Sequence, residues 1–153
     1  MANISPQYRY QNGPGHVGSY QISGIPYATG AFDVPALGAA PLAINFPNVT
    51  KYIIIQNEVT DAKVRVGFSA LGVSGSAAPG GGAKGSGNYY VLVPGENKLE
   101  LGDIRVESIY LLADASSAVP GVSLIAGLTG IITGSIPGRV PGTLNWSGSA
   151  GVG

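Results

Sequence analysis

The sequence contains no cysteine and only one histidine, His16. Without cysteine the chain has no disulfide framework, no zinc-thiolate site and no thiol nucleophile, which fits assembly in a reducing compartment. Any mechanism that pairs histidine with serine, with a metal or with a second histidine would rest on His16 alone. Because His16 lies beside Pro14 and Gly15, we interpret it as a surface or turn residue and expect no catalytic and no metal site.

Charge is also scarce, and its two signs cancel. Only 10% of the residues are charged, eight basic and eight acidic, against about 25% in an ordinary soluble domain. Such a surface has little field to attract nucleic acid or an anionic membrane, so we expect no direct nucleic-acid binding. An uncharged, apolar exterior left free would promote aggregation. We therefore expect other subunits to cover much of this surface.

Long hydrophobic runs are absent as well. The first ten residues lack the basic and apolar regions of a secretory signal. The only membrane candidate is the uncharged stretch 115–138, which Pro120 and five glycines interrupt. A spanning helix needs about 20 mostly apolar residues. We expect a strand followed by a Gly/Pro-rich tail here, and no membrane span.

What is abundant is glycine, with 25 residues, and proline, with 11. Both oppose helix interiors, so we expect no helices. Between them lie short segments rich in Val, Ile and Tyr, which are typical of strands. The expected strands are 18–25, 42–46, 50–57, 63–68, 89–93, 98–101, 104–112 and 122–128.

Three of these strands carry specific expectations. In 63–68 apolar and polar residues alternate, which predicts a sheet with one solvated face. The continuous apolar run in 50–57 predicts a strand that is buried on both sides. Strands 89–93 and 98–101 flank Pro94-Gly95, which fits the centre of a type II turn and predicts a hairpin.

Eight short strands without covering helices favour an antiparallel sandwich or barrel. We expect an all-β fold: a single eight-stranded antiparallel jelly-roll sandwich with extended N- and C-terminal arms. Fibronectin-like and immunoglobulin-like sandwiches stay open, although the Cys, Trp, Cys framework of true immunoglobulins is missing.

The expected organisation is an N-terminal arm (1–15), a jelly-roll domain (16–135) and a C-terminal arm (136–153). The arms combine Gly and Pro with a few large apolar side chains, which suit docking into a neighbour; a strap across the chain's own domain is the alternative. The candidates for subunit contacts are Tyr8, Tyr10, Leu144 and Trp146. Within the domain, 69–87 is expected to be an exposed, flexible loop.

Several motifs suggest chemistry but have simpler explanations. The G-x-G-x-x-G pattern occurs at 13–18 and 80–85, yet neither match has the strand before it and the helix after it that a dinucleotide site requires. We therefore expect no cofactor. N-glycosylation sequons occur at Asn3, Asn48 and Asn145, but without a secretory signal they carry little weight.

The carboxylates are also expected to be structural. Glycosidases need two carboxylates about 5 to 10 Å apart, and the acidic cluster is Glu96, Glu100, Asp103 and Glu107. Lys98 and Arg105 lie among them, so we expect cross-strand ion pairs on a solvated face. Four aspartates lie near expected turns, where Asp commonly bonds its own backbone. Calcium binding by these loops is an alternative, although the aspartates do not have the spacing of an EF-hand. They are Asp33, Asp61, Asp103 and Asp114.

Seven segments together resemble a known family. They are HVGSYQISGIPY (16–27), KYIIIQN (51–57), VRVGFSALGV (64–73), NYYVLVPGENKLEL (88–101), IYLLAD (109–114), AGLTGI (126–131) and NWSGSAGVG (145–153). In this order they resemble the small single jelly-roll capsid proteins of large icosahedral double-stranded DNA viruses of the algal and giant-virus type.

The resemblance implies a penton, the subunit that forms a homopentamer at each five-fold vertex. Its partners would be itself and the neighbouring major and minor capsid proteins, and its location the virion, assembled in the host cell cytoplasm. It implies no ligand residues and no enzyme activity. A minor capsid, cement or fibre-base protein is an alternative. A carbohydrate-binding β-sandwich, with Tyr89 and Tyr90 as a stacking surface, is an alternative of another class.

Overall fold

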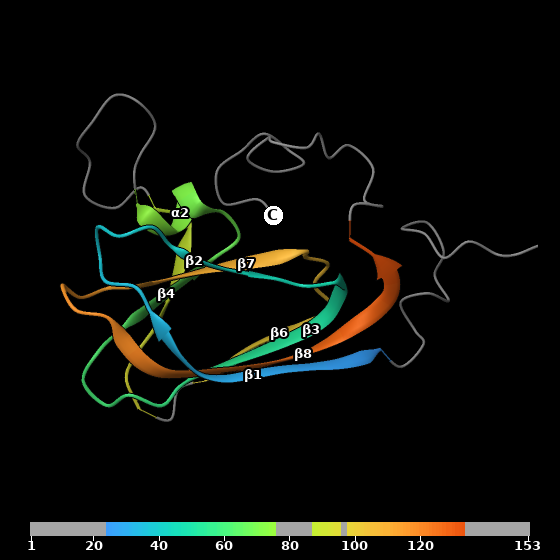
Figure 1. The fold of residues 1–153 in the computed structure, drawn as a ribbon, viewed down its shortest axis with the longest axis horizontal. Coiled ribbons are helices and arrows are strands. Elements are labelled where there is room, and N and C mark those ends of the chain that lie inside the picture. The colour runs from blue at the N-terminus through green and yellow to red at the C-terminus, as the bar shows by residue number, and fades with distance from the viewer. Residues whose placement is uncertain (1–23, 76–86, 96–97, 134–153) are drawn as a thin grey trace, which may run out of the picture.

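The computed structural model describes residues 24–75, 87–95 and 98–133. They form two four-stranded antiparallel sheets that pack face to face (Figure 1). The strands are β1 (Ile25–Val34), β2 (Leu42–Asn45), β3 (Asn48–Asn57), β4 (Val64–Gly67), β5 (Tyr89–Leu92), β6 (Lys98–Gly102), β7 (Ser108–Ala113) and β8 (Val119–Ile132). Sheet A has the order β1-β8-β3-β6, and sheet B has the order β2-β7-β4-β5.

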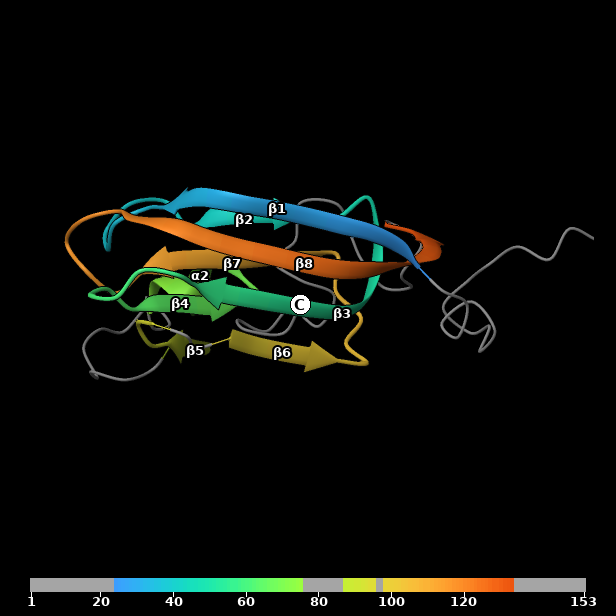
Figure 2. The same cartoon turned by 90° about the horizontal axis from the view of Figure 1, so that it is seen from below.

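The strand order is that of a jelly roll. When the strands are lettered B to I along the chain, sheet A becomes BIDG and sheet B becomes CHEF. The expected all-β, eight-stranded antiparallel jelly-roll sandwich is confirmed, and the immunoglobulin arrangement, with strands ABED against CFG, is not the one observed. Figure 2 shows the four strands of sheet A in front of the strands of sheet B.

The core lies between the sheets and consists of aliphatic side chains from both. Ile53 and Ile55 of β3 and Leu124 of β8 enter it from sheet A, and Ile109 and Leu111 of β7 enter it from sheet B. All five are at most 1% exposed. The alternation of inward and outward side chains along each strand, which is intrinsic to β geometry, therefore decides which residues form the core.

The expectation that 50–57 is buried on both sides is wrong. Ile53 and Ile55 are 0% exposed, but Tyr52 between Lys51 and Ile53 is 40% exposed. No other layer covers the outer face of sheet A in the part of the chain that the structure describes. Isoleucine favours a strand whichever face its side chain lies on. A run of isoleucines therefore predicts a strand but does not show which of its faces are buried.

The predicted hairpin between 89–93 and 98–101 is also wrong. Strand β5 pairs with β4 in sheet B, whereas β6 pairs with β3 in sheet A. Pro94-Gly95 thus starts a connection from one sheet to the other. Gly95 has a φ of 95°, which only glycine adopts readily. Turn chemistry predicted the change of direction but could not tell which strands pair.

Other strand bounds shift because of local irregularities. Most of 18–25 lies outside the described residues, and β1 runs on to Val34 through irregular register around Thr29 and Phe32. Asp33 therefore lies within β1 and not in a turn. Strand β7 begins at Ser108 and not at 104, and β8 extends beyond 122–128 at both ends. None of the helices in the described segments is long and apolar enough to cross a membrane.

The sequence also missed a short helix, α2 (Ala70–Ser74), in the expected flexible loop. The Ser69 side chain accepts a hydrogen bond from the Gly72 amide at its start, and Gly75 ends it with a φ of 65°, both common helix caps. Val73 is fully buried against Gly67, where an added Cβ would lie 2.5 Å from Val73 Cγ2. Residues 69–75 are thus packed, and 76–86 lie outside the described residues.

Thr50 holds the crossing from sheet A to sheet B in place, and replacing it is expected to destabilise the fold. Its buried hydroxyl donates to the Ile104 carbonyl at 2.9 Å and accepts from the Val106 amide at 3.1 Å. Thr50→Val leaves both backbone groups without this partner, so we expect a loss of about 1–3 kcal/mol in the free energy of unfolding, measured by urea denaturation. Ser123→Ala, which removes an exposed hydroxyl bonded to Glu58, should change stability by less than about 0.5 kcal/mol. Equal effects of the two changes would contradict this role.

Candidate functional site

One member of the acidic cluster, Glu100, forms an ion pair on the surface of β6. Lys98 Nζ lies 2.7 Å from Glu100 Oε1, and both side chains are more than half exposed. The two residues are neighbours on one face of β6, since side chains two apart in a strand share a face. The expected cross-strand pair is therefore wrong for Glu100: its partner lies in the same strand. Glu96 lies outside the described residues.

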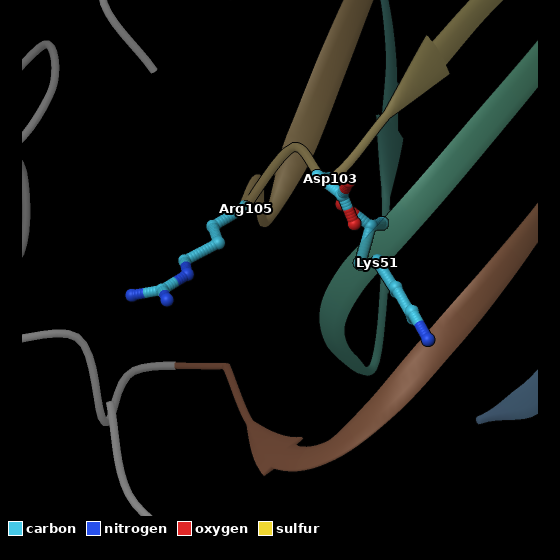
Figure 3. Close-up of a pocket in the computed structure, with 4 residues that line it drawn as sticks. Lys51, Asp103 and Arg105 are labelled. Atoms are coloured by element: carbon cyan, nitrogen blue, oxygen red, sulfur yellow. The ribbon is translucent and has the colours of Figure 1, made fainter. Parts of the chain in front are cut away.

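A small hollow is lined by Thr50, Lys51, Asp103 and Arg105. Its volume is about 90 Å³, well below the roughly 300 Å³ at which small-molecule sites begin. Figure 3 shows the Lys51 and Arg105 side chains pointing away from each other, so their charges do not converge on one ligand. In the described segments, no three His, Cys, Asp or Glu residues lie close enough to hold a metal ion.

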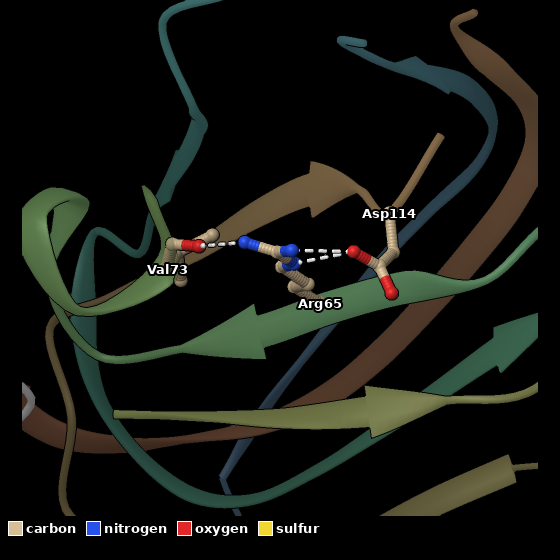
Figure 4. A network of polar contacts seen from close by, with 3 residues as sticks. All are labelled: Arg65, Val73 and Asp114. Carbon is tan, nitrogen blue, oxygen red and sulfur yellow. Dashed lines mark hydrogen bonds and ion pairs between the residues drawn. The ribbon is translucent and has the colours of Figure 1, made fainter. Parts of the chain in front are cut away.

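A polar network in the described part of the chain surrounds Arg65 (Figure 4). Its Nε and Nη2 both donate to Asp114 Oδ1, with Nε at 2.9 Å. Its Nη1 donates to the Val73 carbonyl at 3.5 Å, and the guanidinium lies 4.5 Å from the centre of the Tyr89 ring. Asp114 thus bonds a distant side chain, which corrects the expectation that it bonds its own turn.

This network is structural, because each contact joins a different element of the fold. Arg65 lies in β4, Asp114 follows β7, Val73 belongs to α2 and Tyr89 begins β5. The Arg65 side chain is only 13% exposed, so little of the guanidinium can contact a ligand. An added Cβ at Gly75 would lie 3.3 Å from Arg65 Nη1. The guanidinium thus lies against Gly75, the last described residue before segment 76–86.

Tyr89 and Tyr90 do not form a shared stacking surface. As neighbours in β5 they point to opposite faces of sheet B. Arg65 covers one face of the Tyr89 ring, whereas Tyr90 is 58% exposed. These two tyrosines thus do not form a platform of paired rings on which a sugar could stack.

The outer face of sheet A carries a continuous group of apolar residues. Across the sheet, Ala28 of β1 lies opposite Ile125 of β8, which lies opposite Ile54 of β3. One step along, Gly127 of β8 lies opposite both Pro26 and Tyr52. Residues directly opposite in antiparallel strands share a face. We call this group the apolar face; it consists of Pro26, Ala28, Tyr52, Ile54 and Ile125.

Two large side chains of the apolar face are exposed in the described part of the chain. Ile125 is 52% exposed and Tyr52 is 40% exposed. The Tyr52 ring lies over Gly127, where an added Cβ would be 2.3 Å from Tyr52 Cε1; glycine in a strand permits such close approach. Because the ring lies along the sheet, it extends the apolar surface across three strands.

Polar groups border the apolar face. Towards one end, Ser123 Oγ donates to Glu58 Oε1 at 2.9 Å. Along β6, the pair of Lys98 and Glu100 forms another part of the rim. An apolar centre with a polar rim is the usual anatomy of a protein interface. Of the surfaces that the structure describes, this one is the strongest candidate for a functional site.

The predicted contact residues and the observed face are different sets. Tyr8, Tyr10, Leu144 and Trp146 all lie outside the described residues, as does His16, so these predictions stay predictions. Sequence analysis missed Tyr52, Ile54 and Ile125. The alternation of side chains along a strand could have predicted that Tyr52, Ile54 and Gln56 share the outer face of β3. The run of apolar residues at 52–55 made the two faces of the strand look alike in the sequence.

Comparison of the chain with models of protein families, with curated proteins and with solved structures gives no match. What the chain does must therefore follow from its fold and its surface.

Proposed function

We propose that this chain is a structural capsid protein, the penton subunit that forms a homopentamer at the five-fold vertices of an icosahedral capsid. The observation that carries the proposal is the apolar face on a jelly-roll sandwich. Jelly rolls build many viral shells, although they also occur in lectins and cupins. Because a fold does not itself confer a function, the surface must support the choice.

The surface suits a subunit that is surrounded by others. A shell protein contacts neighbours on several sides, so extensive apolar and weakly charged surface is an advantage once assembled. Only 10% of the residues are charged, and the apolar face offers Tyr52 and Ile125 to a partner. Aromatic residues are enriched at the centres of interfaces. The partners under this proposal are other copies of the chain and the neighbouring major and minor capsid proteins.

A minor capsid, cement or fibre-base protein shares these features and differs only in its place in the particle. No observation favours the carbohydrate-binding alternative, because Tyr89 and Tyr90 point to opposite faces of sheet B.

The proposal predicts a closed ring of five subunits in solution. Native mass measurement of the full-length protein should give a species about five times the 15.4 kDa chain mass, since cyclic assemblies close with a fixed copy number. Imaging of the native particle should place the chain at the five-fold vertices. A stable monomer that binds glycans would contradict the proposal. A position elsewhere in the particle would favour the minor capsid alternative.

A further inference from the structure

We propose that the apolar face of one subunit is covered by residues 136–153 of a neighbouring subunit. The inference deepens the proposed function and rests on its self-association, because it names the surface and the segment that meet. Three observations favour this occupant: its composition, its charge and the point at which it leaves the sandwich.

The composition of 136–153 matches that of the surface. The segment has a single charged residue, Arg139, and two large apolar side chains close together, Leu144 and Trp146. Its two prolines favour an extended chain without internal hydrogen bonds. An extended segment of this kind can lie across the strands of the apolar face and place Leu144 and Trp146 against Tyr52 and Ile125.

The charges are complementary. The described part of the chain has five basic residues (Lys51, Lys63, Arg65, Lys98 and Arg105) and seven acidic ones (Asp33, Glu58, Asp61, Glu100, Asp103, Glu107 and Asp114). It therefore has a net charge of −2, whereas 136–153 has a charge of +1 in its side chains. At the rim of the apolar face, Glu58 bonds the neutral hydroxyl of Ser123, which leaves its negative charge to attract Arg139.

The exit of the chain favours a neighbour over the same subunit. The Thr133 amide and hydroxyl both donate to the Pro47 carbonyl, at 3.3 and 3.1 Å. In Figure 1 the end of β8 curves from the layer of sheet A towards sheet B. The end of β8 therefore points away from the apolar face of its own sheet, and a chain that continues from it would have to turn around the end of the sandwich to reach that face.

The length of the segment allows contact with a neighbour. Thirteen residues separate Thr133 from Trp146, and an extended chain of that length spans about 43 Å. That length exceeds the roughly 26 Å, at about 3.3 Å per residue, of the eight steps from Ile125 in β8 to Thr133, which follows the end of β8. Reach therefore does not exclude docking on the chain's own face, and it is the direction of exit that favours the neighbour.

Disulfide trapping tests the inference. Because the chain has no cysteine, no native thiol can form a competing disulfide. Ile125→Cys is placed on the apolar face of one full-length protein, and Trp146→Cys in the segment of a second. The two proteins are mixed in denaturant, refolded together and oxidised, and linked peptides are identified by mass spectrometry. Docking brings the two thiols to an effective concentration in the mM range, so we expect about tenfold or more disulfide over a control mixture. The control replaces Ile125→Cys with Ala43→Cys, an exposed position on sheet B.

Each outcome decides the inference. A link between positions 125 and 146 of different chains supports it. In a third protein that carries both changes, a link that forms only within one chain would overturn it. A link between two copies of position 125, or a yield equal to the Ala43→Cys control, would overturn it as well. If the native mass still shows a pentamer in those cases, the proposed function stands and only this contact is wrong. If the native mass shows a monomer, the homopentamer fails as well.

Discussion

Deletion of residues 136–153 is expected to abolish the pentamer while leaving the sandwich folded. All eight strands and the whole described core lie before residue 134, so the deletion removes no core side chain known from the structure. It does remove Leu144 and Trp146. If each anchor contributes about 2 kcal/mol, as buried interface residues often do, their joint loss weakens association about 10³-fold. Sedimentation measures the association, and urea denaturation measures the fold.

A shorter deletion provides the matched control. Removing 148–153 keeps both Leu144 and Trp146 and should leave the pentamer intact. The opposite pattern would show that the segment is a strap across its own domain. In that case the 136–153 deletion unfolds the domain, and the subunit contacts of the full-length protein prove to lie elsewhere. The uncovered apolar face should also make the truncated protein more prone to aggregate at high concentration.

Asp114→Ala is expected to lower the free energy of unfolding by about 2–4 kcal/mol. The change leaves the Arg65 guanidinium, which is only 13% exposed, without its carboxylate, and removing one partner of a buried pair costs about 3–5 kcal/mol. We place the effect slightly lower because Asp114 is 29% exposed. Small domains have only about 5–15 kcal/mol of stability in total, so urea denaturation would detect this loss clearly.

Glu100→Ala is the control for the Asp114→Ala experiment. It breaks the exposed pair with Lys98, and such surface pairs contribute about 0–1 kcal/mol. A double replacement, Arg65→Met with Asp114→Leu, removes both charges and should cost less than Asp114→Ala alone. A result in which Asp114→Ala and Glu100→Ala have the same effect would mean that the Arg65 network adds little to stability.

Local patterns predicted the strands because they depend on neighbours in the sequence. Alternation in 63–68 and the β-branched run in 50–57 both correspond to strands, β4 and β3. The absence of cysteine and the single histidine restrict chemistry in the same direct way. Patterns failed where the outcome depends on distant residues. The hairpin expected around Pro94-Gly95 failed because β5 pairs with β4 and β6 pairs with β3, strands that lie much earlier in the chain.

The sequence by itself therefore determined the fold class, the number of strands and the scarcity of charge and reactive side chains. Only the tertiary structure decided that β5 and β6 belong to different sheets and that Arg65 meets Asp114, 49 residues away. It also assembled the apolar face, whose members come from β1, β3 and β8. The reason is that strand periodicity is local, whereas strand pairing joins segments far apart in the chain, and only pairing determines which outward residues lie side by side.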